Sequence, residues 1–462
     1  MKKFEQYKRI IKFGFAMVIV LLEIAIYAYV WYKYYNPLLE NPFWRRGNWL
    51  IIVLYGMLLL FFLKTYGGLK IGFLKKGNLI YSQILSVLFV NIVTYIQIAL
   101  IDKKFHNVLM ILVVTLLDVL AIVVWTFVFQ WIYGRIFPAR RMLYVHGNRS
   151  TSYLRDKINS REDKYQICRN LDYRCGMERL FKEIDKYDAV IIDDIPSHER
   201  NRLIKECYNR SIRTYSAPKI SDILIRSSGE MNLFDSPLLL SKNDGLQIEQ
   251  KIVKRLLDIA ISATGLLISS PLFLLIAISI KCTDRGPVFY KQKRLTQGGK
   301  EFKIYKFRTM IQDAEKGGKA VLARDEDDRI LPVGKILRRL RLDELPQLWN
   351  ILKGDMSMVG PRPERPELMA EIVEEIPEFV YRLKVKAGLT GYAQVYGKYN
   401  TTPYDKLKLD MLYIENYSFW LDIKILLMTF KVILQKENSE GIDENQITAL
   451  KREIESKTTT KY

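Results

Sequence analysis

Long apolar runs alternate with short charged segments over the first third of the chain. They predict four transmembrane helices, because three of the runs reach the roughly 20 residues that a helix needs to cross about 30 Å of hydrocarbon. The second run is shorter and needs its flanking residues to span. The four runs are Phe13–Trp31, Trp49–Leu63, Leu79–Ile101 and Val108–Tyr133.

The distribution of lysine and arginine predicts how these helices are oriented. The segments before the first run, between the second and third, and after the fourth hold five, four and three such residues, against three and two in the alternate loops. This bias indicates that both ends of the bundle face the cytoplasm. No small-residue cleavage site follows the first run, so we expect a retained span rather than a removed signal peptide.

Polar side chains lie inside the apolar runs, and four of them are considered for a role. Such groups are expected to face other helices or a cavity rather than lipid. Hydrogen bonds between helices would explain them. A transport path is the alternative, which the lack of paired intramembrane charges disfavours. The four are Glu23, Asn91, Gln97 and Asp118.

After residue 137 the pattern becomes that of a soluble α/β domain. A strand-like Arg141–His146 leads into a glycine turn, and the apolar Ala189–Ile192 ends in two aspartates. The alternation predicts a Rossmann-like unit over 138–245. Its turn, Gly147-Asn148-Arg149-Ser150, lacks the Gly-x-Gly-x-x-Gly spacing that lets a pyrophosphate approach, so we expect no tight dinucleotide binding.

A fifth apolar segment, Leu256–Ile280, follows a linker-like stretch at 235–250. As a straight helix of about 37 Å it could cross a bilayer, but lysine and arginine flank both of its ends. Proline near its midpoint removes a backbone donor and bends the helix. We therefore expect a re-entrant helix with its bend at Ser270 and Pro271, and a fifth full span is the alternative.

The amino-acid composition gives the chain a strong positive charge and few cysteine and histidine residues that could bind a metal. The formal net charge of +21 over 462 residues indicates an anionic membrane face or phosphate-bearing substrates. No nucleic-acid-binding pattern is present, so we expect no nucleic acid partner. The four cysteines and three histidines have no zinc-type spacing, and free cytosolic thiols are expected.

The run Arg341-Leu342-Asp343-Glu344-Leu345-Pro346-Gln347 carries the most specific chemistry. Two adjacent carboxylates precede a proline that can open a helix, among several cations. Carboxylates in such a setting fit phosphoryl chemistry, in which the cations hold a phosphate. An acidic cap on a surface helix is the alternative.

Other motifs surround this run in a fixed order. They are Gly286–Arg294, Phe302–Met310, Asp328-Arg329, Leu342–Asn350 and Gly354–Pro363. From about Lys254 to Leu434 the chain resembles the bacterial sugar transferases, the monotopic polyprenyl-phosphate phosphoglycosyl transferases. The spans and the Rossmann-like unit resemble the long members that begin exopolysaccharide, capsule or O-antigen assembly.

The resemblance implies transfer of a sugar-1-phosphate from a UDP-sugar to undecaprenyl phosphate, with release of UMP. The aspartate of the family's Asp-Glu pair attacks the β-phosphorus and forms a covalent phosphoglycosyl intermediate, which makes Asp343 the expected nucleophile. Asp343 and Glu344 are the expected Mg²⁺ ligands, because this cation prefers carboxylate oxygens beside phosphates. A structural ion pair is the alternative for Glu344. UDP-glucose and UDP-galactose are the first expected donors.

Cationic and polar side chains near the pair are the expected substrate ligands. Arginine offers a planar fork that matches phosphate oxygens. The residues expected to hold the nucleotide sugar are Gln292, Arg294, Lys306, Arg308 and Arg362, and those expected near the polyprenyl phosphate headgroup are Lys254 and Arg255.

Three residues depart from the family pattern. Thr296 stands where glycine is common, Ala387 replaces the usual proline, and Arg341 replaces a serine. The first two look like turn positions, so we expect the departures to affect loop stiffness before catalysis.

The predicted whole is a membrane protein of mixed α and α/β structure. We expect it in the bacterial inner membrane, as a homodimer with its catalytic domain on the cytoplasmic face. A catalytically inactive, membrane-tethered nucleotide sensor is the alternative, which the intact Asp343-Glu344 pair argues against. The predicted parts are a four-helix transmembrane bundle at 1–137, a Rossmann-like domain at 138–245, a catalytic domain at 246–435 with its re-entrant helix at 256–280, and a charged tail at 436–462.

Overall fold

The chain has a mixed α/β fold that divides into two compact units, the first ending at Ala217 and the second beginning at Pro218. The predicted domain boundaries stay predictions, and the predicted tail lies outside the described residues. The computed structural model describes residues 5–147, 152–233, 235–241, 245–312, 327, 329–398 and 401–434.

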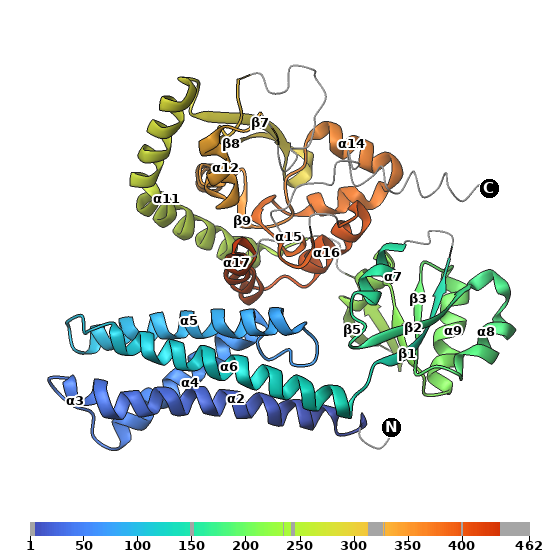
Figure 1. Cartoon of the computed structure of the whole chain (residues 1–462). Helices are drawn as coiled ribbons and strands as arrows, with labels where there is room; N and C mark the ends of the chain where they lie inside the picture. The colour runs from blue at the N-terminus through green and yellow to red at the C-terminus, as the bar shows by residue number, and fades with distance from the viewer. Residues whose placement is uncertain are drawn as a thin grey trace. The chain divides into compact units, whose positions relative to one another are not determined.

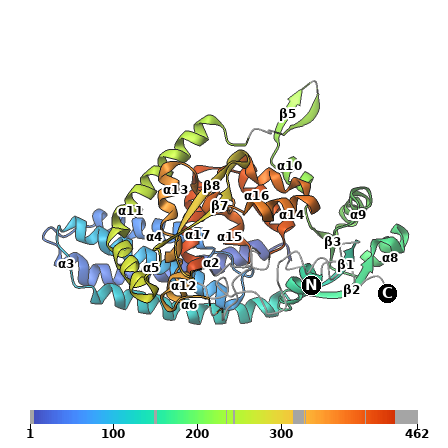
Figure 2. The ribbon, with the colours of Figure 1, turned by 90° about the horizontal axis from the view of Figure 1, so that it is seen from above.

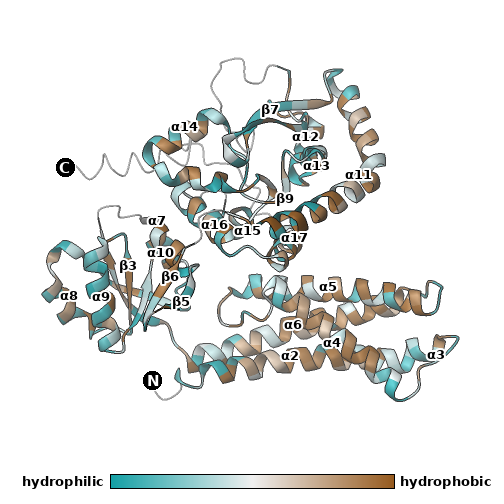
Figure 3. Ribbon diagram, turned by 180° about the vertical axis from the view of Figure 1, so that it is seen from behind, coloured by the Kyte–Doolittle hydropathy of each residue, from teal (hydrophilic) through white to brown (hydrophobic). Residues whose placement is uncertain are grey.

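Each of the four N-terminal apolar runs forms a long helix, and the helices pack side by side in an N-terminal bundle (Figure 1). All four are long and apolar enough to cross a membrane, and Figure 3 shows apolar residues along their lengths. Their insertion as a transmembrane bundle stays a prediction. The bounds are α2 Lys8–Val30, a π-helical turn Trp31–Tyr35, α3 Asn36–Leu38, α4 Arg46–Tyr66, α5 Lys76–Ile101 and α6 Leu109–Ile136.

Polar side chains inside the bundle join its helices. The Tyr55 hydroxyl donates to Asn91 at 3.1 Å, and the Asn91 amide donates to Asp118 at 3.4 Å. These bonds connect α4, α5 and α6, and they confirm the predicted interhelical role for Asn91 and Asp118. Glu23 is fully buried, and Gln97 is half-buried.

A parallel sheet of order β2-β1-β3-β4 follows the bundle. Leu143 and Val145 of β1 pack on the face that α8 and α9 cover, whereas Met142 and Tyr144 pack on the face of α7 (Figure 1). This alternation of strands and helices confirms the predicted α/β structure of this part of the chain, and the predicted extent of the Rossmann-like domain stays a prediction. The bounds are β1 Arg140–His146, α7 Ser152–Asn159, β2 Tyr165–Asp172, α8 Met177–Ile184, β3 Ala189–Asp193, α9 Ser197–Asn209 and β4 Arg213–Ser216.

The turn after β1 requires its glycine. A Cβ atom at Gly147 would lie 1.9 Å from the carbonyl oxygen of Asp194, so no other residue fits without displacing the backbone after β3. The following Asn148-Arg149-Ser150 lie outside the described residues.

The predicted linker at 235–250 is wrong in part. An antiparallel hairpin of β5 Gly229–Leu233 and β6 Ser236–Leu240 follows α10 Ile220–Arg226, and Figure 2 shows the hairpin projecting from its unit. Apolar runs as short as that in β6 show too little periodicity to separate a strand from a linker.

Helix α11 runs from Ile248 to Asp284, beyond both ends of the predicted segment, and contains Pro271. Figure 1 shows its two arms running in different directions. Proline cannot donate to the carbonyl of Leu267 one turn earlier, and the Ser270 hydroxyl donates to that carbonyl at 2.8 Å instead. The expected bend is therefore present, and re-entry from one membrane face stays a prediction.

Short elements complete the second unit around two small sheets. Phe307 and Leu337 form an apolar core with Ile276 and Ile280 of α11, which fixes the second arm of that helix. The bounds are β7 Phe289–Leu295, β8 Glu301–Phe307, α12 Pro332–Arg339, α13 Gln347–Lys353, β9 Ser357–Val359, α14 Pro366–Glu375, β10 Gly388–Thr390, α15 Tyr392–Tyr396, α16 Pro403–Glu415 and α17 Phe419–Ile433, with 3₁₀ turns at Leu342–Glu344 and Pro377–Lys384.

Candidate functional site

The two adjacent carboxylates lie in a tight turn between α12 and α13. The chain reverses at Arg341, whose φ of 56° is left-handed, and Asp343 and Glu344 then form a single 3₁₀ turn. Pro346 precedes the first residue of α13, as the sequence predicts. The turn fixes both carboxylates on a short, well-bonded segment.

Three cations surround the Glu344 carboxylate. Its Oε1 accepts a hydrogen bond from Lys306 at 2.8 Å and lies 3.6 Å from Arg362 and 3.7 Å from Arg341. Burial opposes ionisation of this group, but Lys306, Arg362 and Arg341 outweigh it and hold the pKa of Glu344 well below its usual range. Glu344 is therefore a fixed anion that gathers three cations.

Asp343 has the opposite environment. Its side chain is buried, and its Oδ1 has no hydrogen-bond partner among the described residues. Burial, and then repulsion from Glu344, raise the pKa of Asp343. A poorly solvated carboxylate with a free lone pair is suited to act as a nucleophile.

Asn350 sets the position of Lys306 relative to the carboxylates. The fully buried Asn350 accepts from the backbone N–H of Tyr305 at 3.0 Å and donates to the carbonyl of Lys303 at 2.8 Å. These bonds join α13 to β8, the strand that carries Lys306. Asn350 lies in the Leu342–Asn350 motif, but the sequence does not indicate its role as a link between these two elements.

The β9–β10 pair positions Arg362. Its strands hydrogen-bond in parallel, and the chain turns at Gly360, where a Cβ atom would lie 2.3 Å from the carbonyl of Lys386. Glycine therefore permits the close approach, and Pro361 stiffens the step into Arg362. The structure brings Lys306, Arg362 and the carboxylate pair together, as the sequence predicts.

The carboxylate pair is also the candidate metal site. Among the described residues, no group of three or more His, Cys, Asp or Glu side chains is arranged to hold a metal. Mg²⁺ commonly uses only one or two carboxylates together with waters and substrate phosphates. Asp343, with its unpartnered oxygen, and Glu344 fit that limited demand.

Arg294 and Gln292 lie behind Arg362 rather than on the pair. Arg294 donates to Gln292 at 2.7 Å and to the carbonyl of Pro363 at 3.2 Å. Burial, and then repulsion from Arg362, lower the pKa of Arg294 to about 10. These bonds favour a role in holding the Arg362 loop.

Arg308 forms an ion pair away from the carboxylates. Its guanidinium bonds to Asp284 at the end of α11 and to the carbonyl of Pro287 at 2.6 Å. The side chain is buried. This geometry favours a role for Arg308 as an anchor of the second arm of α11, and its predicted contact with a nucleotide phosphate stays a prediction.

Lys254 and Arg255 also have protein partners. The buried Lys254 ammonium bonds to Asp422 at 2.6 Å and to the Tyr413 hydroxyl at 3.0 Å. Arg255 donates to the carbonyls of Ile351 and Leu352 at 2.6 and 2.7 Å, at the end of α13. Both residues fix the first arm of α11, so their predicted contact with a lipid phosphate would have to compete with these bonds.

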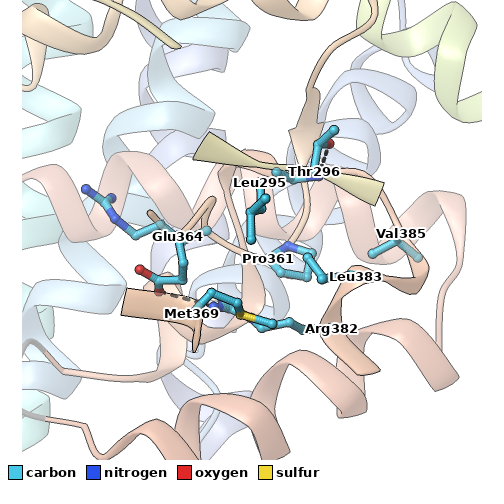
Figure 4. A pocket seen from close by; sticks show the side chains of 10 residues that line it. Leu295, Thr296, Pro361, Glu364, Met369, Arg382, Leu383 and Val385 are labelled. Carbon is cyan, nitrogen blue, oxygen red and sulfur yellow. Dashed lines mark hydrogen bonds and ion pairs between the residues drawn. The ribbon is translucent and has the colours of Figure 1, made fainter. Parts of the chain in front are cut away.

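A small cavity lies beside Arg362, and Figure 4 shows the Glu364–Arg382 ion pair at its wall. Two of the three departures from the family pattern meet there. The backbone N–H of Ala387 donates to the Thr296 hydroxyl at 3.2 Å, and that hydroxyl donates to the carbonyl of Asp355 at 2.9 Å. Proline at 387 has no donor and glycine at 296 has no acceptor, so the departures complement each other.

Arg341 is the third departure, and it lies in the candidate site although the sequence motifs do not mark it as a ligand. It contributes to the cation cluster on Glu344 and lowers the pKa of Asp343 against the raising effect of burial. The basic character around the Asp-Glu run was visible in the sequence, but the left-handed turn that aims Arg341 was not.

Comparison with known proteins finds a family whose model matches the part of the chain that contains the candidate site. The family model described as "Bacterial sugar transferase" matches residues 249–436. The chain is 37% identical over 293 residues to the UDP-N-acetylgalactosamine-undecaprenyl-phosphate N-acetylgalactosaminephosphotransferase of Aeromonas hydrophila, covering 59% of this chain and 68% of the relative.

Two further relatives are named for other sugars. The UDP-glucose:undecaprenyl-phosphate glucose-1-phosphate transferase of Klebsiella pneumoniae is 35% identical, over 56% of this chain and 55% of the relative. The galactosyl transferase CpsE of Streptococcus agalactiae is 40% identical, over 40% of this chain and 42% of the relative. The chain thus spans about half the length of these two proteins.

Proposed function

The chain belongs to the bacterial sugar transferase family, and on this basis we propose that it transfers a hexose-1-phosphate from a UDP-sugar to undecaprenyl phosphate and releases UMP. The observation that carries the proposal is the contrast at Asp343 and Glu344. One carboxylate is buried with an unpartnered oxygen, and its neighbour gathers Lys306, Arg341 and Arg362.

The reaction proceeds in two displacements at one phosphorus atom. A carboxylate oxygen of Asp343 bonds to the β-phosphorus while the bond to the bridging oxygen breaks, and UMP leaves with that electron pair. A phosphate oxygen of undecaprenyl phosphate then bonds to the same phosphorus, and the Asp343–phosphorus bond breaks. The carboxylate is thereby regenerated.

The surrounding side chains meet the charge demand of these steps. Lys306, Arg341 and Arg362 outnumber the two carboxylates, so the site can accept a diphosphate. Asp343 and Glu344 would hold Mg²⁺ with the substrate phosphates, and the bound cation would offset the charge that opposes attack by a carboxylate.

The contacts of helix α11 support the proposal that it enters the inner membrane from the cytoplasmic face and returns to the same face. Its first arm is bonded through Lys254 to Asp422, and its end through Asp284 to Arg308, so both arms are fixed to one compact unit. A bilayer cannot separate them without dividing that unit. Between them lie apolar side chains that are 61–76% exposed and available to lipid, namely Leu256, Leu267, Ile268, Leu274 and Leu275.

The sugar donor, the product and the oligomeric state are proposed from the family resemblance and the names of the relatives alone. UDP-glucose and UDP-galactose are the first donors to test, and the names of the relatives add UDP-N-acetylgalactosamine. The product would begin an exopolysaccharide, capsule or O-antigen repeat unit. A homodimer is retained from the family resemblance.

The test is UMP release by membranes containing the full chain, with each UDP-sugar, undecaprenyl phosphate and Mg²⁺. We expect Asp343→Asn to abolish release, while Glu301→Gln at an exposed ion pair leaves it unchanged. A donor labelled in its β-phosphate should label wild-type protein when lipid is absent and leave Asp343→Asn unlabelled. UMP release that Asp343→Asn does not diminish would rule out the covalent step.

A further inference from the structure

The end of the N-terminal bundle nearest the Rossmann-like domain carries a cluster of lysines and aromatic rings. Lys8 and Lys12 lie one turn apart on α2, and Lys164 precedes β2 of the Rossmann-like domain. These three residues are called the lysine cluster below. The rings that face them are Phe73, Tyr133 and Phe137.

The rings hold the three ammonium groups close together. Phe73 lies 3.9 Å from the Lys164 ammonium and 4.8 Å from that of Lys12, measured to the ring centroid. The Lys12 ammonium is also 5.4 Å from Tyr133, and that of Lys8 is 4.6 Å from Phe137. Contacts of this kind stabilise cations without neutralising them.

The loop between α4 and α5 is shaped for this arrangement. Gly72 has a φ of +65°, and a Cβ atom there would lie 2.8 Å from the Tyr133 ring and 3.1 Å from the Lys12 side chain. Glycine therefore permits Phe73 to reach both lysines. The adjoining Arg161 donates to the Phe73 carbonyl, which ties the loop to the Rossmann-like domain.

The protein offsets only part of the charge in the cluster, because Glu5 acts on Lys8 and Asp163 acts on Lys164 while both carboxylates form their ion pairs with arginines. Nearby arginines have carboxylate partners, since Arg213 pairs with Glu5 at 3.2 Å and Arg161 with Asp163 at 2.8 Å. In the part of the chain that the structure describes, no carboxylate forms an ion pair with a member of the lysine cluster. Burial, and then repulsion from Lys12, Arg161 and Lys8, lower the pKa of Lys164 to about 8.

Exposed aromatic residues place this end of the bundle at the headgroup level of the proposed membrane. Tyr7 is 50% exposed and Trp131 is 59% exposed, and the Arg135 guanidinium lies 4.1 Å from the Trp131 ring. Tryptophan and tyrosine are enriched at membrane–water interfaces. Basic clusters between helices at this depth bind anionic headgroups.

We propose that the lysine cluster binds the phosphodiester headgroup of an anionic phospholipid. The ammonium groups contact the phosphate oxygens, and the rings cover the first part of the glycerol backbone. Because Lys164 belongs to the Rossmann-like domain and Lys8 and Lys12 belong to α2, one headgroup links that domain to the bundle. This site is independent of the proposed transfer reaction.

The test is thermal unfolding of the purified full-length protein in a neutral detergent with added lipid. We expect phosphatidylglycerol to give a saturable rise of several degrees in Tm, with no such rise from phosphatidylcholine or inorganic phosphate. An equal rise with phosphatidylcholine would overturn the proposal. So would a rise that only undecaprenyl phosphate produces, because the site would then bind the substrate lipid.

Variants localise the effect. Lys12→Gln with Lys164→Gln should lose at least half of the rise, and Lys12→Arg with Lys164→Arg should retain it. Lys33→Gln, at the exposed opposite end of the first span, is the matched control and should behave as wild type. An undiminished rise in the glutamine variant would contradict the assignment. If the glutamine variant does not fold, the Tm rise of the arginine variant and the comparison of phosphatidylglycerol with phosphatidylcholine and undecaprenyl phosphate still test the proposal.

Discussion

The adjacent carboxylates Asp343 and Glu344 have the same chemistry but opposite environments in the candidate site. Glu344 is stabilised as an anion by three cations, whereas Asp343 is buried with an oxygen that no described group satisfies. Desolvation of an ionised group costs free energy unless partners repay it. The proposed reactivity of Asp343 is therefore obtained at the expense of stability, whereas the ion pairs of Glu344 stabilise the same turn.

This contrast predicts stability changes of opposite sign. Asp343→Asn removes an unpaired buried charge and should raise the free energy of unfolding by about 1 kcal/mol, as functional sites often allow. Glu344→Gln deprives Lys306 of its partner and should lower it by about 1–3 kcal/mol. Denaturant unfolding with a metal chelator present measures both changes. A destabilised Asp343→Asn protein would show that the carboxylate has a structural partner.

The Thr296–Ala387 hydrogen bond gives a second prediction for single side chains. Ala387→Pro removes the donor and Thr296→Gly removes the acceptor, and each change should cost stability on its own. The double variant restores the residues common in the family and should cost less than the sum of the two, by about 1 kcal/mol. Strict additivity in this double-mutant cycle would mean that the two departures are unrelated.

Sequence motifs identified the centre of the site but not its supports. The Asp-Glu run, Lys306 and Arg362 lie in recognisable motifs, and the structure brings them together. Lys254 and Asp422 are separated by 168 positions, and no periodic pattern connects residues so far apart. A lysine that pairs within the fold and one that faces a lipid phosphate look alike in sequence.

Among the secondary-structure elements, helix α11 likewise has features that the sequence predicts and contacts that it does not. Its apolar length and its proline predicted a bent helix, because both effects are local. Its anchors are tertiary, and they determine what Lys254 does. The β5–β6 hairpin was missed because its exposed leucines have neither a buried face nor a turn pattern that marks a strand pair.

The anchor of the first arm predicts how α11 responds to mutation. Asp422→Asn leaves the buried Lys254 ammonium without its 2.6 Å partner, and we expect a loss of about 3–5 kcal/mol in stability. Glu301→Gln, at the exposed Lys293 pair, should cost at most about 1 kcal/mol. Urea unfolding of both variants makes the comparison.

A double variant separates the two roles considered for Lys254. Lys254→Met with Asp422→Leu removes both charges and should restore most of the stability that Asp422→Asn loses. If Lys254 is an anchor, the KM for undecaprenyl phosphate in this variant should match that of wild type. A strongly raised KM in a stable protein would return Lys254 to the headgroup site that the sequence predicts.

In the molecule as a whole, the position of the chemistry depends on the membrane topology of α11. A re-entrant helix keeps the carboxylate pair on the face that its two arms share, whereas a spanning helix would divide the second unit. The positive net charge of +21 is suited to an anionic membrane surface. Both arms of α11 are bonded to the same unit, which predicts a single accessible face.

Cysteine labelling tests this topology with a reporter that the chain already contains. Cys282 is exposed near the end of α11, and Lys251→Cys places a second reporter before its first arm, in variants that each keep one cysteine. We expect both to react with a membrane-impermeant maleimide only after the cells are permeabilised, as exposed Cys168 of the Rossmann-like domain should. Phe105→Cys, in the exposed loop between α5 and α6, should react in intact cells. Reaction of one α11 reporter but not the other in intact cells would establish a spanning helix, and the proposed active site would then need a different route to both of its substrates.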